Sequence, residues 1–212
     1  MLDHSSSNSQ PHQMDRHDSC VCIKYIRAKT RPNICLSGAA DGADLYWGQC
    51  ATLADHDLIH WTFPGHRTQA PETQIVRLSD EELKLGTEAL NNAATVLNKF
   101  PPSRPTVTRL LLRNYYQVAW SESCYAVTVI GDNPGGTAWA TTMFAQLHPG
   151  NENLYLFDME RNGWFQWREN EWVGIESPPR PRGVWTGIGS RDLKENGKNA
   201  IMALLGVEVS EE

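Results

Sequence analysis

The stretch Trp185–Leu193, WTGIGSRDL, decides the fold and lies close to the end of this chain of 212 residues. Apolar residues lead into two glycines and a Ser-Arg pair, and a segment with apolar side chains at helical spacing follows. A strand, a glycine turn and a helix in this order open many nucleotide-binding folds, because the turn and the helix N-terminus let a phosphate approach the backbone. The position of this motif at the end of the chain therefore needs an explanation.

Two further glycine turns follow apolar segments of strand composition. Residues 37–44, SGAADGAD, come after Ile34–Leu36, and residues 131–137, GDNPGGT, come after the apolar run 124–130. Strand-like and helix-like segments alternate along the chain, which predicts an α/β fold of the three-layer Rossmann type: a mostly parallel sheet with helices on both faces. Ligands of such sheets lie at the carboxyl ends of the strands, so the three turns are expected around one crevice.

The remaining elements follow from periodicity and from capping and turn residues. We expect an edge strand at 21–26, further strands at 57–63, 153–158 and 182–187, and a small Trp-rich β-hairpin inserted at 163–175. The expected helices cover 43–54, a long segment from the capping box at Ser79 to about Lys99, 107–120, 137–147 and 190–206. Residues 1–19 have too few apolar side chains to form a core, so we expect a disordered tail before a single domain at 20–212.

Charge and composition argue against several classes of protein. The formal net charge of -6 disfavours a dedicated nucleic-acid binder, which needs a basic surface to neutralise phosphates. No apolar run is long enough to cross a membrane, and the first residues lack the apolar core of a secretory signal, so we expect a cytoplasmic protein. The five cysteines are an odd number and include no C-x-x-C pair, so we expect neither a disulfide framework nor a metal site. Cys20-x-Cys22 near His12 and His17 leaves a metal clip as the alternative to reduced thiols.

Four segments together resemble the SLOG superfamily, which unites the LOG-type phosphoribohydrolases with the DNA-processing protein A family. They are CLSGAADGAD (35–44), LLLRNYYQV (110–118), GDNPGGTAWA (131–140) and WTGIGSRD (185–192), with Ala39 and Ala138 where the family pattern has glycine. The resemblance covers most of residues 33–206. In that superfamily the T-G-I-G-S-R strand and its helix come first. The resemblance therefore implies a circular permutation, and it predicts that Gly206 and Ile34 are neighbours in space.

The first candidate for a functional side chain is Arg113. Arg113 and Gln117 are four residues apart, hence on one face of a helix, and Asn114 adjoins them. The resemblance implies that this arginine meets the phosphoribosyl end of a ligand, while the alternative is a surface arginine. Arg191 follows a glycine turn and either binds phosphate or pairs with Asp192 or another carboxylate.

Further candidates come from the three turns and from the end of the strand at 57–63. Asp41 could accept ribose hydroxyls or act as a base, whereas Asp44 is expected to cap the helix that it starts. Arg67 ends its strand beside His66, and Trp61 is a candidate for stacking on a nucleobase, although tryptophans mostly pack in cores. The expected backbone cradle consists of Ser37, Gly38, Ala39, Gly42, Gly135, Gly136, Thr137, Gly187, Gly189 and Ser190. The hydroxyl groups of its serine and threonine residues either bind phosphate or cap helices.

One departure from the family pattern bears on catalysis. LOG-type enzymes carry P-G-G-x-G-T-x-x-E, whose glutamate serves the cleavage, but residues 134–142 of this chain contain no carboxylate. We therefore expect a protein that binds a nucleotide or phosphoribosyl compound such as ADP-ribose or NAD, for sensing or sequestration, with no other cofactor. An N-glycosidase of the LOG type using Arg113 and Asp41 is the alternative, and a single-stranded DNA accessory protein is a third. The resemblance implies a homodimer, and the Trp-rich hairpin is expected to be a lid or a dimer contact.

Overall fold

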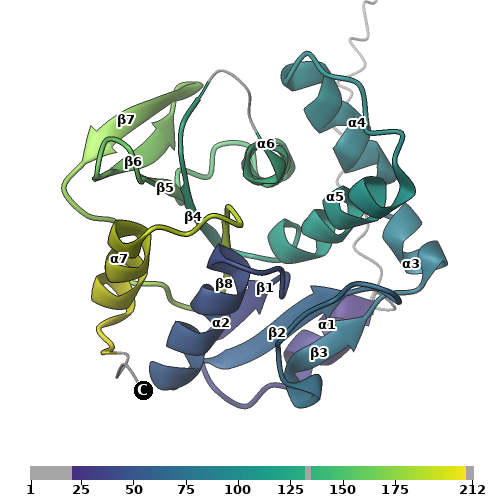
Figure 1. Cartoon of the computed structure of the whole chain (residues 1–212), viewed down its shortest axis with the longest axis horizontal. Coiled ribbons are helices and arrows are strands. Elements are labelled where there is room, and N and C mark those ends of the chain that lie inside the picture. Colours follow the sequence, from purple (N-terminus) through teal and green to yellow (C-terminus); the bar gives the residue numbers. More distant parts are fainter. Residues whose placement is uncertain (1–20, 132–134, 209–212) are drawn as a thin grey trace, which may run out of the picture.

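The computed structural model describes residues 21–131 and 135–208, and in this part of the chain eight strands form one sheet (Figure 1). Their order is β3-β2-β1-β8-β4-β5-β6-β7. The first six of these run parallel, and β6 and β7 continue the sheet as an antiparallel edge. The strands are β1 (Ile34–Ser37), β2 (Asp57–Thr62), β3 (Ile75–Arg77), β4 (Ser123–Thr128), β5 (Leu154–Asp158), β6 (Gly163–Arg168), β7 (Glu171–Ile175) and β8 (Val184–Gly189).

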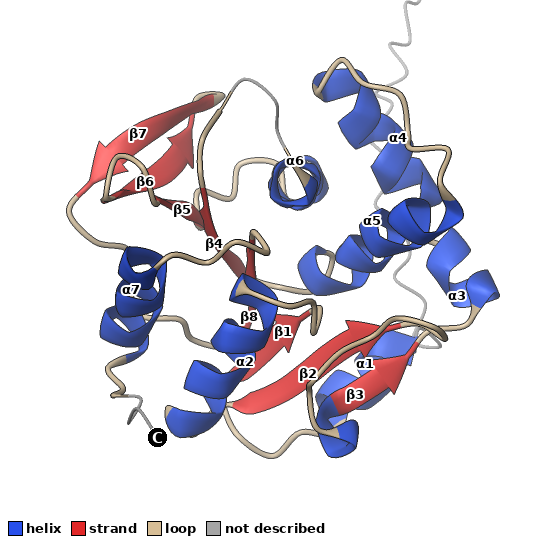
Figure 2. Cartoon of the chain, viewed as in Figure 1, coloured by secondary structure: helices blue, strands red, loops and turns tan. Residues whose placement is uncertain are grey.

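Helices cover both faces of the sheet, which confirms the predicted three-layer α/β fold (Figure 2). One face packs against α2 and α7, and the other packs against α4, α5 and α6. The helices are α1 (Val21–Arg27), α2 (Ala43–Leu53), α3 (Asp80–Lys84), α4 (Thr87–Val96), α5 (Pro105–Val118), α6 (Gly136–Leu147) and α7 (Glu195–Leu205). Among the described residues, no helix is both long enough and apolar enough to cross a membrane.

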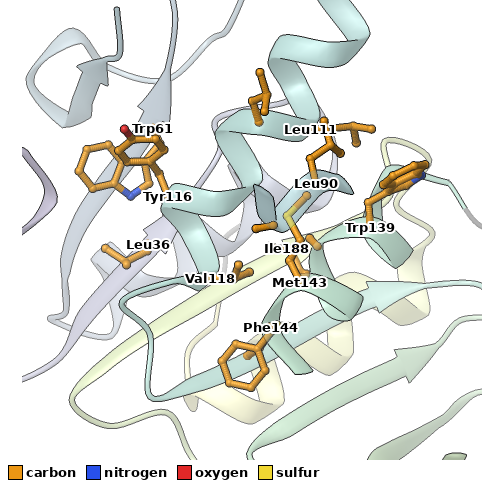
Figure 3. Close-up of a cluster of buried hydrophobic side chains, with 14 of the residues drawn as sticks. Leu36, Trp61, Leu90, Leu111, Tyr116, Val118, Trp139, Met143, Phe144 and Ile188 are labelled. Atoms are coloured by element: carbon orange, nitrogen blue, oxygen red, sulfur yellow. The ribbon is translucent and has the colours of Figure 1, made fainter. Parts of the chain in front are cut away.

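Each face of the sheet has its own buried core. Figure 3 shows the core under α4, α5 and α6, in which Leu36 of β1 and Ile188 of β8 meet Tyr116 of α5 and Met143 of α6. On the opposite face Trp47 of α2 packs edge-to-face on Trp185, with ring centroids 5.6 Å apart. These large apolar side chains are removed from water, and their burial supplies the main force that holds the helices on the sheet.

The last strand of the chain occupies the middle of the sheet. β8 lies between β1 and β4. If β8, β1, β2, β4 and β5 are renumbered 1 to 5, their spatial order in the sheet, β2-β1-β8-β4-β5, becomes the Rossmann order 3-2-1-4-5. Asn33, which precedes β1, and Leu205, which ends α7, line the same cavity of about 190 Å³. The two ends that a permutation would have joined therefore lie beside each other. The permutation itself remains a prediction.

Two predicted elements differ from the structure, and packing explains both. The expected edge strand at 21–26 is the helix α1, whose Cys22 is buried and whose Tyr25 ring lies 6.1 Å from Trp61. The expected long helix from Ser79 to about Lys99 is divided into α3 and α4, although the capping box is present. Gly86 lies at the interruption, so close to α5 that a Cβ there would lie 2.9 Å from the Leu112 carbonyl oxygen and the Tyr115 side chain.

Two smaller differences concern the strand and helix ends. The three-residue strand β3 was not expected, since a segment this short has no detectable periodicity. The last helix begins at Glu195 instead of 190, so Arg191 lies in the loop that precedes the helix. The remaining predicted strands and helices agree with the structure to within about two residues.

Candidate ligand site at the carboxyl edge of the sheet

Two of the three glycine turns pack directly against each other at the carboxyl ends of β1 and β8. The Ala43 N–H donates a hydrogen bond of 3.1 Å to the Ser190 carbonyl oxygen. A Cβ at Gly42, which has a φ of 88°, would collide with the backbone of Arg191, and a Cβ at Gly189 would collide with Ala43 and the Val127 carbonyl oxygen. In this structure these two glycines allow backbone segments to touch.

Helix α5 brings Arg113 to the same edge. Its Nη1 donates a hydrogen bond of 3.1 Å to Oδ2 of Asp44, and the two residues are only 3% and 5% exposed. The guanidinium group fills the space where Gly38 would have a Cβ, which explains the glycine. Arg113 is therefore not a surface arginine. The expected helix cap by Asp44 is wrong, since the N-cap position of α2 is Gly42 and Asp44 is a buried ion-pair partner.

Burial acts against the charges of this pair. Burial raises the pKa of the Asp44 carboxyl, and the Arg113 guanidinium opposes the rise. Burial also lowers the pKa of Arg113, while Asp44 favours its charged form. Each charge is kept in the interior mainly by the other, so removal of either partner leaves an uncompensated buried group.

Two polar atoms beside this pair have no hydrogen-bond partner among the described residues. They are Nε of Arg113 and Nδ1 of His66, whereas the side chain of the fully buried Gln117 lies against the Asp44 carboxyl. Buried polar groups in folded proteins are almost always hydrogen-bonded to protein, water or ligand. The edge of the sheet therefore has hydrogen-bonding capacity that the described part of the chain does not use.

Two histidines lie at the end of β2, on the same edge. His60 is buried, and its Nδ1 accepts a hydrogen bond of 3.1 Å from the Ala39 N–H. Burial lowers the pKa of His60 to about 4, and the nearby Arg113 contributes. Burial and Arg113 likewise lower the pKa of His66 to about 4, while Asp41 opposes this. Both rings are neutral near pH 7, so neither adds a positive charge to the site.

The predicted hydroxyl donors of the first and last turns are used within the protein. The Ser37 hydroxyl lies 2.9 Å from the carbonyl oxygens of Asp44 and of Gly187. The Ser190 hydroxyl donates to the Asp192 carbonyl oxygen at 3.4 Å. Gly187 packs against Trp47, with no room for a Cβ. These residues hold the two turns in position.

The rim above this buried layer carries the exposed charges of the predicted site. Asp41, Arg67 and Arg191 are all exposed to solvent. Among the described residues neither arginine forms an ion pair, so the expected alternative of an Arg191–Asp192 pair is not formed. Within the described part of the chain, two guanidinium groups without an ion pair and the carboxylates of Asp41 and Asp192 thus border the packed turns.

The third turn leads into α6, and its described residues are open. A Cβ at Gly135 would meet nothing within 4 Å, and α6 has no side-chain cap. Asn114 donates a hydrogen bond of 3.4 Å to the Gly136 carbonyl oxygen, which connects α5 with the first turn of α6, where Thr137 is buried. Gly135 and Gly136 are exposed, whereas Gly42, Gly189 and Ser190 of the predicted cradle are partly exposed.

A cavity of about 690 Å³ begins beside this third turn. Its lining includes Gly131 and Gly135 at one end, one side of α6, and Trp167 and Trp172 of the β6–β7 hairpin. The hairpin forms a fixed wall because β6 is hydrogen-bonded to β5. Trp61 is excluded as a stacking platform in this structure, since it is fully buried against Tyr116.

Sequence reasoning missed this wall of the cavity, although a signal was present. Trp167 and Trp172 are paired across the hairpin, so both project from the same face, and their ring centroids are 5.0 Å apart. The alternation of side chains along two short strands predicts the shared face. Which helix lies opposite that face depends on the tertiary structure.

Comparison with known proteins adds no family assignment: a scan against family models, a search of curated proteins and a search of solved structures found no match. The resemblance to the SLOG superfamily therefore remains a prediction. Among the described residues no group of three His, Cys, Asp or Glu side chains could hold a metal ion, and Cys20, His12 and His17 lie outside these residues.

Proposed function

We propose that this protein binds a phosphate-bearing nucleotide or phosphoribosyl ligand at the carboxyl edge of its sheet, and senses or sequesters it. The observation that carries the proposal is the buried guanidinium of Arg113, whose Nε has no partner among the described residues. It lies at the carboxyl end of β1, beside the switch in strand order where open α/β sheets bind their ligands. A planar guanidinium group is also well suited to phosphate.

The surrounding charges fit a ligand with a negative end and a sugar. Arg67 and Arg191 are exposed and unpaired within the described chain, so a phosphate can approach them without breaking an ion pair. Asp41 is exposed on the same edge and can accept hydrogen bonds from ribose hydroxyls. The charges of Asp44 and Arg113 already compensate each other below the rim.

Binding without turnover is favoured by the residues of α6. Cleavage of an N-glycosidic bond needs a group that stabilises the oxocarbenium-like charge or activates water. The helix sequence GTAWATTMFAQL carries no carboxylate, and Asp44 is occupied by Arg113. Asp41 is a predicted catalytic carboxylate that is exposed at this edge, so the hydrolase alternative can be tested at this residue.

Isothermal titration with ribose 5-phosphate, AMP, NAD and ADP-ribose tests the proposal. We expect at least one ligand to bind, and Arg191→Ala or Arg67→Ala to weaken its affinity by about tenfold, since each removes a charged hydrogen bond. Arg31→Ala is the matched control, because Arg31 is exposed and paired with Asp55 at the amino edge of the sheet. No binding by the folded protein, or an equal loss in the control, would overturn the proposal.

The same ligands serve to test the N-glycosidase alternative. Release of free base, followed by chromatography, would be abolished by Asp41→Asn if Asp41 activates water. Turnover of this kind would replace the binding function with the enzymatic one.

A further inference from the structure

A smaller cavity, of about 190 Å³, lies at the amino edge of the sheet, where Asn33 precedes β1. Helices α2 and α7 lie side by side and end at this cavity (Figure 1). The polar side chains that line it are those of Asn33, His56, Arg180 and Arg182. Each of these side chains can donate hydrogen bonds and none is acidic, so the cavity is suited to a ligand that accepts hydrogen bonds.

The hydrogen bonds of His56 fix the position of its proton. The indole Nε1–H of Trp185 donates to Nδ1 of His56 at 3.2 Å, and an indole nitrogen can only donate. Burial lowers the pKa of His56, Asp55 opposes this shift, and Arg31 adds to it. The ring is therefore neutral near pH 7, with one lone pair and one N–H group. Because Nδ1 uses the lone pair, the proton lies on Nε2.

The side-chain amide of Asn33 meets this N–H group with a second donor. The Asn33 Oδ1 accepts a hydrogen bond of 3.1 Å from the Gly183 N–H, which fixes the orientation of the amide. Its Nδ2 lies 3.3 Å from Nε2 of His56. Two N–H groups cannot bond to each other, and within the described chain neither has an acceptor. One oxygen atom placed beside both groups would satisfy them together.

The two arginines add positive charge at the same place. Arg180 and Arg182 are exposed, and among the described residues neither forms an ion pair or a side-chain hydrogen bond. The ends of α2 and α7 carry about half a negative elementary charge each, so about one of the two positive charges remains uncompensated. Asp55 is paired with Arg31, and Glu122 forms no ion pair within the described chain.

The backbone holds this segment in place before any ligand arrives. Pro181, between the two arginines, is buried and restricts the backbone to one φ value. A Cβ at Gly206, which ends α7 with a φ of +67°, would collide with the Arg180 guanidinium. The hydrogen bond from Gly183 to Asn33 attaches the segment to the start of β1. Donors that are already in position lower the entropic cost of binding.

From this arrangement we infer that the amino edge holds a binding site for a small oxyanion of the phosphate or sulfate type, separate from the site at the carboxyl edge. The volume of about 190 Å³ is below the range of about 300–1,000 Å³ that is usual for ligand pockets, so it suits a tetrahedral anion and is too small for a nucleoside. His56 and Asn33 donate to one oxygen, and the guanidinium groups of Arg180 and Arg182 bind the others. This inference does not depend on the proposed function.

Nuclear magnetic resonance titration locates the site, with sodium phosphate, sodium sulfate and ribose 5-phosphate as probes at constant ionic strength in chloride. We expect inorganic phosphate to shift the backbone amides of residues 33, 56 and 182–183. The indole N–H of Trp185 should shift with them, because it is bonded to His56. Tighter binding of ribose 5-phosphate than of inorganic phosphate at these residues identifies a phosphomonoester as the ligand, and equal or weaker binding identifies the free anion.

Two variants test the donors separately. Arg182→Gln should weaken phosphate by about tenfold, since it removes one charged hydrogen bond. Asn33→Asp replaces the Nδ2 donor with an acceptor of the same shape, which can bond to His56 and still accept from Gly183. We therefore expect it to weaken phosphate by more than tenfold without destabilising the free protein.

Arg104→Gln is the matched control, because Arg104 is exposed at the start of α5, outside the cavity, and has no ion pair among the described residues. It should leave the phosphate affinity within about twofold. An equal loss in this control, or the same shifts with chloride alone, would show only screening of surface charge and would overturn the inference.

Two further results would also overturn the inference. Shifts confined to residues 38–44 and 189–191 would place phosphate at the carboxyl edge alone, and they would still support the proposed function. Undiminished binding by Asn33→Asp, with circular dichroism showing a folded protein, would exclude the two facing donors from the site.

Discussion

The buried pair of Asp44 and Arg113 provides the sharpest test of how the edge of the sheet is built. The Nη1–Oδ2 distance is 3.1 Å, and the two side chains are 7% and 4% exposed. Breaking a buried ion pair by removing one partner costs about 3–5 kcal/mol, because the remaining charge has no compensation. We therefore expect Asp44→Asn and Arg113→Met each to lower the free energy of unfolding by about 3 kcal/mol or more.

The double variant separates the pair from the individual residues. With both charges removed, no uncompensated group remains. We expect the free energy of unfolding of the double variant to be about 2–3 kcal/mol higher than the value obtained by adding the effects of the two single substitutions. Urea unfolding followed by tryptophan fluorescence measures all four proteins. A parallel cycle on Asp80 and Arg109, an exposed pair on α3 and α5 at 2.7 Å, is the matched control, and its coupling should be only about 0.2–1 kcal/mol.

A coupling at Asp44 and Arg113 as small as that of the exposed pair would refute this reasoning. Such a result would mean that the two charges do not compensate each other in the folded protein.

Two further predictions concern the turns and the buried histidine. Gly42 and Gly65 share a φ of +88°, but only Gly42 lies against the backbone of Arg191. Gly42→Ala should therefore lower the free energy of unfolding in urea by about 1–3 kcal/mol more than Gly65→Ala does. Equal losses would exclude the close approach. Burial lowers the pKa of His60 from 6.5 to about 4. The folded protein therefore holds the ring neutral, and this contributes no penalty to stability above pH 6.5. As the pH falls from 6.5 toward 4, the unfolded chain binds the proton first, and the fold loses up to about 3 kcal/mol of stability. His60→Gln should flatten the dependence of the urea midpoint on pH in this range, and an unchanged slope would show that the ring protonates freely.

Much of the fold was predictable from local signals in the sequence. The glycine turns after apolar segments indicated where strands end, and the alternation of strands with helices indicated a parallel sheet. Capping residues such as Ser79 and Glu82 were also decisive, because their hydrogen bonds lie within one turn of helix. Periodicity failed at residues 21–26, where alternating and helical patterns overlap, and at Gly86, where the predicted helix is interrupted beside α5.

The sequence indicated which residues lie near the carboxyl edge of the sheet, but not the contacts they make. The four-residue spacing of Arg113 and Gln117 indicated that they share one face of α5, and in the structure both are buried. The partner of Arg113 was not predictable, since Asp44 is 69 residues away in the chain. The glycines were expected to face a ligand, but Gly38, Gly42 and Gly187 face Arg113, Arg191 and Trp47. Glycine marks a close approach, and sequence alone does not say whether the approaching group is a ligand or the protein.

Nuclear magnetic resonance titration of the backbone amides with AMP tests the central claim most directly, because it reports where the ligand binds. Binding at the carboxyl edge predicts that the largest shift changes fall at residues 38–44, 135–137 and 189–191. Changes confined to the amino edge of the sheet, around Asn33 and His56, would contradict the proposed site, and no change at saturating AMP and ADP-ribose would contradict nucleotide binding itself.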